Sequence, residues 1–286
     1  MCEREQGFVV DTSMTRRKLV VAVTSVAAAL GLPGCARAAG VAGRDVVIRT
    51  ADGRADAALF VPAGKGPWPA VLMWPDILGL RPVFREMGER LAEQGYVVLI
   101  PNPFYRTRRA PIVTGSFDFG DKAAMAGLMT LKDSLTDARV ANDARAFLAF
   151  LDEQKEVDRR RPVGVQGYCF SGPFAFRAAA VRPDRVGAVA TFHGGGLVTK
   201  DAYSPHLLIP RTKASFLVAI AQNDDKNQPE AKNILKAAFA AAKRPATVEV
   251  FPADHGWCVA GSPAYNEAAA ERAWAELITF YRATLA

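Results

Sequence analysis

The amino-acid sequence predicts an α/β domain with a mostly parallel sheet of about eight strands and helices on both of its faces. Two observations lead to this prediction. Short β-branched apolar runs alternate along the chain with segments that repeat apolar residues at helical spacing, which is typical of a parallel sheet with covering helices. The chain has 286 residues, half of them hydrophobic, and this is enough for one large domain with a full core.

The expected strands begin with a hairpin. Two short runs at 46–49 and 57–61 flank Asp52-Gly53, a dipeptide that favours tight turns. Six further apolar runs have the length and the composition of buried strands. They lie at 70–74, 96–100, 163–166, 188–192, 216–221 and 248–251.

Between the strands, apolar residues recur three or four positions apart, as they do on one face of a helix. The first such segment starts near Phe84 and ends at Gly95, and the second spans 135–151. Later helices are expected at 174–181, 229–242 and 264–284. Residues 103–132 are rich in Arg, Gly and aromatic side chains, and we expect them to form an irregular cap or loop over a site.

The first 38 residues are predicted to be a cleaved export signal rather than part of the fold. Arg16 and Arg17 precede fourteen uncharged residues, and Ala-Arg-Ala follows at 36–38. The paired arginines favour the twin-arginine route, hence a periplasmic or otherwise exported protein that contacts the export machinery only transiently. Residues 39–286 contain no internal repeat or low-complexity linker, so one domain is the simplest account.

Two features of the signal bear on the membrane. Its apolar stretch is too short for a comfortable transmembrane helix, so we expect no stable membrane insertion after cleavage. The sequence Leu-Pro-Gly-Cys at 32–35 resembles a lipoprotein box, but Pro33 in its middle makes a lipid anchor at Cys35 the less favoured alternative.

Charge and cysteine content exclude several classes of function. The formal net charge of +7 comes from dispersed basic residues, without a zinc-knuckle or helix-turn-helix pattern, so we expect no nucleic-acid binding. After the signal only Cys169 and Cys258 remain, which is too few for a disulfide scaffold and lacks metal-ligand spacing. The sequence also has no glycine-rich phosphate loop, and we expect neither a metal nor an organic cofactor.

The segment around Cys169 predicts a nucleophile. Gly167 and Gly172 stand two before and three after Cys169, between a strand-like run and a helix-like one. A strand that turns this sharply into a helix pushes the central side chain out over the sheet edge, where a nucleophile usually stands. The alternative is that Cys169 is a small buried hydrophobe.

An acid and a histidine follow in the chain order of the α/β-hydrolase triad. His255 comes directly after the last expected strand, whereas His193 follows an earlier strand and is the competing base or a hydrogen-bond partner for a loop. Asp224 and Asp225 both follow the strand at 216–221, and either one could orient His255 while the other caps a helix. His206, between Pro205 and Leu207, is expected to be structural or to lie at the surface.

At this point the chain resembles the dienelactone hydrolases, which are α/β-hydrolases with a Cys-His-Asp triad. Five motifs, spread over nearly the whole mature chain, carry the resemblance. They are WPDILGL at 74–80, NPFYR at 102–106, GYCFSG at 167–172, FHGGG at 192–196 and HGW at 255–257. The third matches the family's Gly-x-Cys-x-Gly-Gly elbow, with Ser171 in place of the first paired glycine.

The resemblance implies a role for each matched residue. Cys169 would attack the carbonyl and form a thioester, His255 would take its proton, and the family's interval from acid to histidine favours Asp224 over Asp225. The backbone amides of Ile77 and Phe170 would form the oxyanion hole. In the family a Glu at the place of Asp76 holds or deprotonates the thiol, and Asp76 is one methylene shorter.

The family resemblance also bears on the substrate. Dienelactone-cleaving members grip a substrate carboxylate with arginines, one of them four residues after the triad histidine, where this chain has Val259. Arg106 could still supply a cation. Phe104, Trp257 and His193 are the other residues expected at the substrate, which we expect to be a small neutral ester or lactone.

Two alternatives stay open at the level of sequence. The elbow could survive in a non-hydrolytic binding or redox protein that retains the hydrolase fold. Cys258, three residues after His255, could be a packed and inert thiol or could pair with Cys169 after export.

Overall fold

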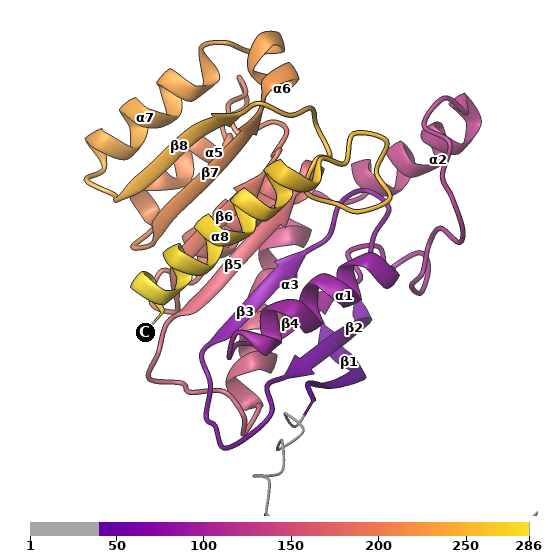
Figure 1. The fold of residues 1–286 in the computed structure, drawn as a ribbon, viewed down its shortest axis with the longest axis vertical. Coiled ribbons are helices and arrows are strands. Elements are labelled where there is room, and N and C mark those ends of the chain that lie inside the picture. The colour runs from indigo at the N-terminus through magenta and orange to yellow at the C-terminus, as the bar shows by residue number, and fades with distance from the viewer. Residues whose placement is uncertain (1–39, 286) are drawn as a thin grey trace, which may run out of the picture. The chain divides into compact units, whose positions relative to one another are not determined.

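The computed structural model describes residues 40–285, and the strands in that range form one eight-stranded sheet (Figure 1). The predicted export signal at 1–38 and Cys35 within it lie outside the described residues. Along the sheet the strands run in the order β1-β2-β4-β3-β5-β6-β7-β8. Their bounds are β1 Ala42–Thr50, β2 Gly53–Val61, β3 Ala70–Trp74, β4 Val97–Pro101, β5 Val163–Tyr168, β6 Val186–Phe192, β7 Ser215–Ala221 and β8 Ala246–Phe251.

The predicted mostly parallel sheet is confirmed. Strands β1 and β2 pair antiparallel, as do β2 and β4, and every other neighbouring pair is parallel. The predicted hairpin is present with its turn one residue earlier than expected. Thr50 pairs with Gly53, so Ala51 and Asp52 form the loop, and Gly53 opens β2 at a φ of +135° that suits glycine.

Helices cover both faces of the sheet, as predicted (Figure 1). Helices α1 (Pro82–Glu93) and α8 (Glu267–Thr284) pack on one face, and α3 (Asp137–Glu153), α4 (Gly172–Val181) and α7 (Ala231–Ala241) pack on the other. All five residues of β3 are buried because both faces are covered. Its side chains alternate between the two cores, with Leu72 and Trp74 in one and Val71 and Met73 in the other.

Several short elements were not predicted. Helix α2 (Lys122–Asp133) lies in the segment expected to be irregular, and Asp121 caps it by accepting the amides of Ala123 and Ala124. Leu128 is its one buried residue, so its sequence carries no broad apolar stripe. Helices α5 (Pro205–Leu208) and α6 (Gln222–Asn227) and the 3₁₀ turns at Cys169–Ser171 and Ile209–Arg211 are too short to show a period.

The turn from β5 into α4 has the sharp geometry that the glycine pattern predicts. Cys169 sits in the left-handed region at a φ of +57°, an uncommon conformation for a residue with a Cβ. A Cβ at Gly167 would lie 2.3 Å from the Ser171 carbonyl oxygen, and one at Gly172 would lie 2.8 Å from Gly194 Cα. Gly167 is therefore required for the turn to close around Cys169, and Gly172 is required for the loop after β6 to lie against that turn.

Candidate active site

A cavity of about 830 Å³ opens where the parallel strands end, and Cys169, His193 and His255 line it together. Cys169 follows β5, His193 follows β6, and His255 lies in the loop after β8. The carboxyl ends of neighbouring parallel strands meet at one edge of the sheet, which is the usual place for ligands in α/β folds. Residues 76–83, 111–119 and 256–264 supply most of the remaining wall.

Ser171 explains how the elbow tolerates a departure from the family's paired glycines. Its buried hydroxyl accepts the Tyr168 amide at 3.0 Å and lies 3.0 Å from the carbonyl oxygen of Trp74, at the end of β3. The serine therefore ties the turn that carries Cys169 to the neighbouring strand. The Cys169 carbonyl oxygen in turn accepts the amide of Gly195 at 3.1 Å, which joins the elbow to the loop after β6.

His255 lies between Asp224 and Cys169. Its Nδ1 is 2.7 Å from Asp224 Oδ2, and the Cys169 side chain lies beside the imidazole. Burial alone would lower the pKa of His255, but the hydrogen bond to Asp224 and the neighbouring Cys169 side chain outweigh it and raise the pKa to about 10. At neutral pH His255 therefore carries a proton and a positive charge.

The structure separates the two candidate acids. Asp225 forms an ion pair with Lys232, whose Nζ lies 2.7 and 2.8 Å from its carboxylate oxygens. Asp224 faces His255, and both aspartates lie inside α6 rather than capping the next helix. The acid that the resemblance favours, Asp224, is thus the one that contacts the imidazole.

Asn223 holds these two loops in register and was missed by sequence reasoning. Its Oδ1 accepts the backbone amides of Asp224 at 3.0 Å and of His255 at 2.9 Å. Gln222 adds a second link between the loops, because its backbone N–H donates to the Ala253 carbonyl oxygen at 3.0 Å. The one available signal was the position of Asn223 beside a candidate acid, directly after a strand.

His193 lies at the site, but its side chain does not form the hydrogen bond to a loop that one interpretation of the sequence predicted. It is 1% exposed, its ring centroid lies 4.8 Å from that of His255, and both ring nitrogens lack a hydrogen-bond partner among residues 40–285. Burial and the neighbouring His255 lower the pKa of His193 well below its usual value, so this ring is neutral. Asp224 lies against His255, which leaves His193 as a wall of the cavity.

Asp76 lines the cavity, but its carboxylate faces Arg81 rather than the thiol. The guanidinium makes two hydrogen bonds to it, at 2.6 and 2.9 Å, and the Leu78 amide donates to the same carboxylate at 3.0 Å. The two side chains are only 14% and 13% exposed. The expected contact between Asp76 and Cys169 is therefore replaced by a bidentate ion pair.

The predicted oxyanion amides occupy suitable places in the chain. Ile77 lines the cavity, and the next two amides, of Leu78 and Gly79, donate to the Asp76 side chain and backbone. Phe170 directly follows Cys169 in the 3₁₀ turn. Within residues 40–285, no cluster of three or more His, Cys, Asp or Glu side chains is placed to hold a metal, and no helix is long and apolar enough to cross a membrane.

Comparison with known proteins identifies the family. The model of the dienelactone hydrolase family matches residues 55–285. The chain belongs to this family. The carboxymethylenebutenolidase of Rhodococcus opacus is 28% identical over 228 residues, which are 78% of this chain and 84% of that protein. As a member of the dienelactone hydrolase family, the protein is an ester or lactone hydrolase.

Solved structures of related proteins have the same fold as this chain. A dienelactone hydrolase-like promiscuous phosphotriesterase from metagenomic libraries superposes with a TM-score of 0.70 at 24% identity, covering 86% of this chain and 100% of that one. The dienelactone hydrolase of Anabaena variabilis gives a TM-score of 0.61 at 16% identity, with 86% and 99% covered. At these identities the likeness shows the α/β-hydrolase fold alone.

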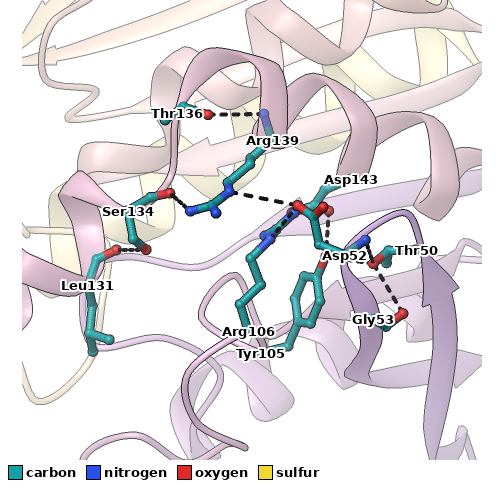
Figure 2. Close-up of polar contacts among 10 residues, drawn as sticks. All are labelled: Thr50, Asp52, Gly53, Tyr105, Arg106, Leu131, Ser134, Thr136, Arg139 and Asp143. Atoms are coloured by element: carbon teal, nitrogen blue, oxygen red, sulfur yellow. Dashed lines mark hydrogen bonds and ion pairs between the residues drawn. The ribbon is translucent and has the colours of Figure 1, made fainter.

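Arg106 does not reach the substrate cavity of this family member, which corrects the expected role. Its guanidinium makes two 2.8 Å hydrogen bonds to Asp143 of α3 and a 2.7 Å hydrogen bond to Asp52 of the β1–β2 turn (Figure 2). Asp143 is 2% exposed and also accepts the Tyr105 hydroxyl at 2.8 Å. A buried carboxylate requires such partners, so Arg106 is held as a structural cation.

Phe104 and Trp257 also lie behind the cavity wall rather than in it. Phe104 is 2% exposed and stacks on Phe170, with centroids 5.7 Å apart. Trp257 is fully buried, stacks on Phe251 and meets the His193 ring edge-on at 5.2 Å. Both aromatic residues support the side chains or turns that form the site, and neither contacts the cavity.

The two cysteines of the described chain are both free thiols. Cys258 packs against the apolar core beneath α1 and α8 and lines a separate cavity of about 190 Å³ beside Tyr168. Burial raises the pKa of the Cys258 thiol well above its usual value. These surroundings fit the packed and inert thiol, the first of the two interpretations.

Replacing Arg106 tests its structural role. We expect Arg106→Ala to lower the free energy of unfolding by about 3–5 kcal/mol, because Asp143 would remain buried without its cation. KM should stay unchanged. Arg109→Ala removes an exposed arginine three residues away and should leave stability unchanged. Urea unfolding and ester kinetics measure both quantities, and a raised KM at unaltered stability would restore Arg106 to the substrate site.

Asn223 can be tested as a positioning residue. We expect Asn223→Leu to lower kcat by up to about 100-fold with little change in KM, because the acceptor shared by the two loops is lost. Asn223→Asp keeps an acceptor oxygen and should restore most of kcat. Asn227→Leu, at an exposed place on the same helix, is the matched control. Equal activity of the Asn223→Leu and Asn227→Leu variants would show that Asn223 does not position the site.

Proposed function

We propose that this hydrolase cleaves a carboxylic ester or lactone through a covalent thioester on Cys169. The observation that carries the proposal is the position of His255, which hydrogen-bonds Asp224 and lies beside the Cys169 side chain at the cavity. A thiolate is a far better nucleophile than a thiol, and a neighbouring imidazolium favours the thiolate. Asp224, on the other side of the imidazole, would stabilise the positive charge of such a thiolate–imidazolium pair.

In the first half of the proposed reaction, Cys169 Sγ attacks the scissile carbonyl carbon. The carbonyl oxygen becomes an oxyanion, which the amides of Ile77 and Phe170 stabilise; one such donor typically contributes about 3 kcal/mol. The tetrahedral intermediate then collapses, the carbon–oxygen bond to the alcohol breaks, and His255 gives its proton to the leaving oxygen. The acyl group remains on Cys169 as a thioester.

In the second half, the neutral His255 takes a proton from water as that water attacks the thioester. Collapse of the second oxyanion releases the carboxylic acid and expels Sγ as a thiolate, which restores the thiolate–imidazolium pair. Asp224 stabilises the imidazolium in both halves. Asp76 enters as the partner of Arg81 and not as a base, because Arg81 and the Leu78 amide engage its carboxylate.

Replacing each free cysteine tests the nucleophile. We expect Cys169→Ala to lower kcat on the order of 10⁴-fold or more without unfolding the domain, and Cys169→Ser to leave a trace of activity. Cys258→Ala, the matched control, should retain activity. Iodoacetamide should label Cys169 in step with inactivation. Wild-type turnover by Cys169→Ala would overturn the mechanism.

The raised pKa of His255 predicts the alkaline limit of activity. A protonated His255 is needed to expel an alkyl alcohol, so kcat/KM should fall as pH rises through about 10. Asp224→Asn removes the partner whose hydrogen bond raises the pKa, and the fall should then begin at lower pH. Hydrolysis of an ethyl ester can be followed by titration of the released acid, with Cys169→Ala as the blank. An unchanged profile in Asp224→Asn would contradict the assignment.

A further inference from the structure

The cavity beside Cys169 is larger than a small ester or lactone requires. Its volume of about 830 Å³ lies in the upper part of the range, about 300–1,000 Å³, of pockets that enclose drug-sized ligands. This size disagrees with the expectation of a small substrate. If Cys169 carries out the proposed ester cleavage, the size and lining of this cavity determine which substrates it can accept.

Most of the wall of this cavity is apolar. Residues of three separate segments share this character: Leu78, Pro82 and Val83 before or in α1, Val113, Phe117 and Phe119 in the irregular loop, and Ala260, Pro263 and Ala264 after His255. The rings of Phe117 and Phe119 meet edge to face, with centroids 5.0 Å apart, and Phe119 is 45% exposed. An apolar group of a substrate would gain contact with all three segments and would cover this exposed surface.

The charges in the cavity disfavour an anionic substrate. Among the residues that line it, Arg81 is the one lysine or arginine, and Asp76 already holds its guanidinium in a bidentate pair. A substrate carboxylate would either share Arg81 with the negative charge of Asp76 or displace Asp76 and leave a mostly buried carboxylate without its partner, and both alternatives weaken its binding. The charge on His255 is likewise paired, with Asp224.

Neither of the two other positions considered for a carboxylate grip supplies a cation. Arg106 is held outside the cavity by Asp143 and Asp52. Val259 is 1% exposed and packs in the core beneath α8. We propose that this hydrolase acts on uncharged esters or lactones that carry a bulky apolar group, and that the Asp76–Arg81 pair discriminates against substrates with a carboxylate near the scissile bond.

Substrate series on the wild-type protein test the size preference. One series lengthens the acyl chain of p-nitrophenyl esters from two to ten carbons, and the other enlarges the alcohol of acetate esters from phenyl to naphthyl. We expect kcat/KM to rise at least about tenfold with size in one series or both, given the gain from each buried methylene. A decline with size in both series would overturn the proposal. If Cys169→Ala also abolished cleavage in that case, the thioester mechanism would stand and only the substrate class would fall.

Two variants test the residues that set the preference. Val113→Trp fills part of the cavity and should lower the kcat/KM for long-chain esters relative to that for the acetate ester. Val47→Trp, at an exposed site on β1, is the control and should keep the wild-type ratio. Asp76→Asn frees Arg81, so hydrolysis of mono-p-nitrophenyl glutarate relative to p-nitrophenyl pentanoate should rise at least about tenfold. An unchanged ratio in Asp76→Asn, or equal use of both esters by wild type, would contradict the proposed discrimination.

Discussion

The site depends on one constraint, the left-handed backbone of Cys169 at the end of β5. Gly167 is needed because a Cβ there would collide with the Ser171 carbonyl inside the turn, and Gly172 because a Cβ there would collide with Gly194 in the loop after β6. Ser171 then ties the turn to β3. Since β5, β7 and β8 run parallel, the segments that follow them meet at the same edge of the sheet. His255, after β8, therefore lies beside the sulfur, and Asp224, after β7, contacts His255. The arrangement of charges in the proposed mechanism follows from this geometry.

Two arginines show how the same residue type takes different roles according to its partner. Arg106 lies against the buried Asp143 and joins the β1–β2 turn to α3, so it stabilises the fold. Arg81 lies in the cavity and is paired with Asp76, so the described residues that line the cavity present no free lysine or arginine. The apolar walls and this neutralised pair act in the same direction, and together they distinguish the cavity from one built to hold a carboxylate.

The sequence predicted the strands and the sharp turn at Cys169, because hydrophobic period and glycine spacing are local signals. It also predicted that His255 lies in the loop after the last strand, because chain order can be read along the sequence. It did not separate Asp224 from Asp225 without the family resemblance, since both follow β7, and only the contacts with His255 and Lys232 divide them. Arg106, Phe104 and Trp257 were assigned to the substrate wrongly, because a motif does not show which way a side chain points. Helix α2 was missed because only one of its residues is buried, so its sequence shows no helical repeat of apolar residues. Asn223 was missed because its role depends on a hydrogen bond to the amide of His255, which lies far along the chain.

The central claim is that the acyl group passes through Cys169, and trapping the intermediate tests it most directly. A p-nitrophenyl ester in excess over the enzyme should release p-nitrophenol in a burst, and acid quenching within the burst should preserve the intermediate. Peptide mass spectrometry should then find the acyl mass on the peptide that contains Cys169, and hydroxylamine should remove it. An acyl group on any other residue, or a burst that leaves none on Cys169, would contradict the account.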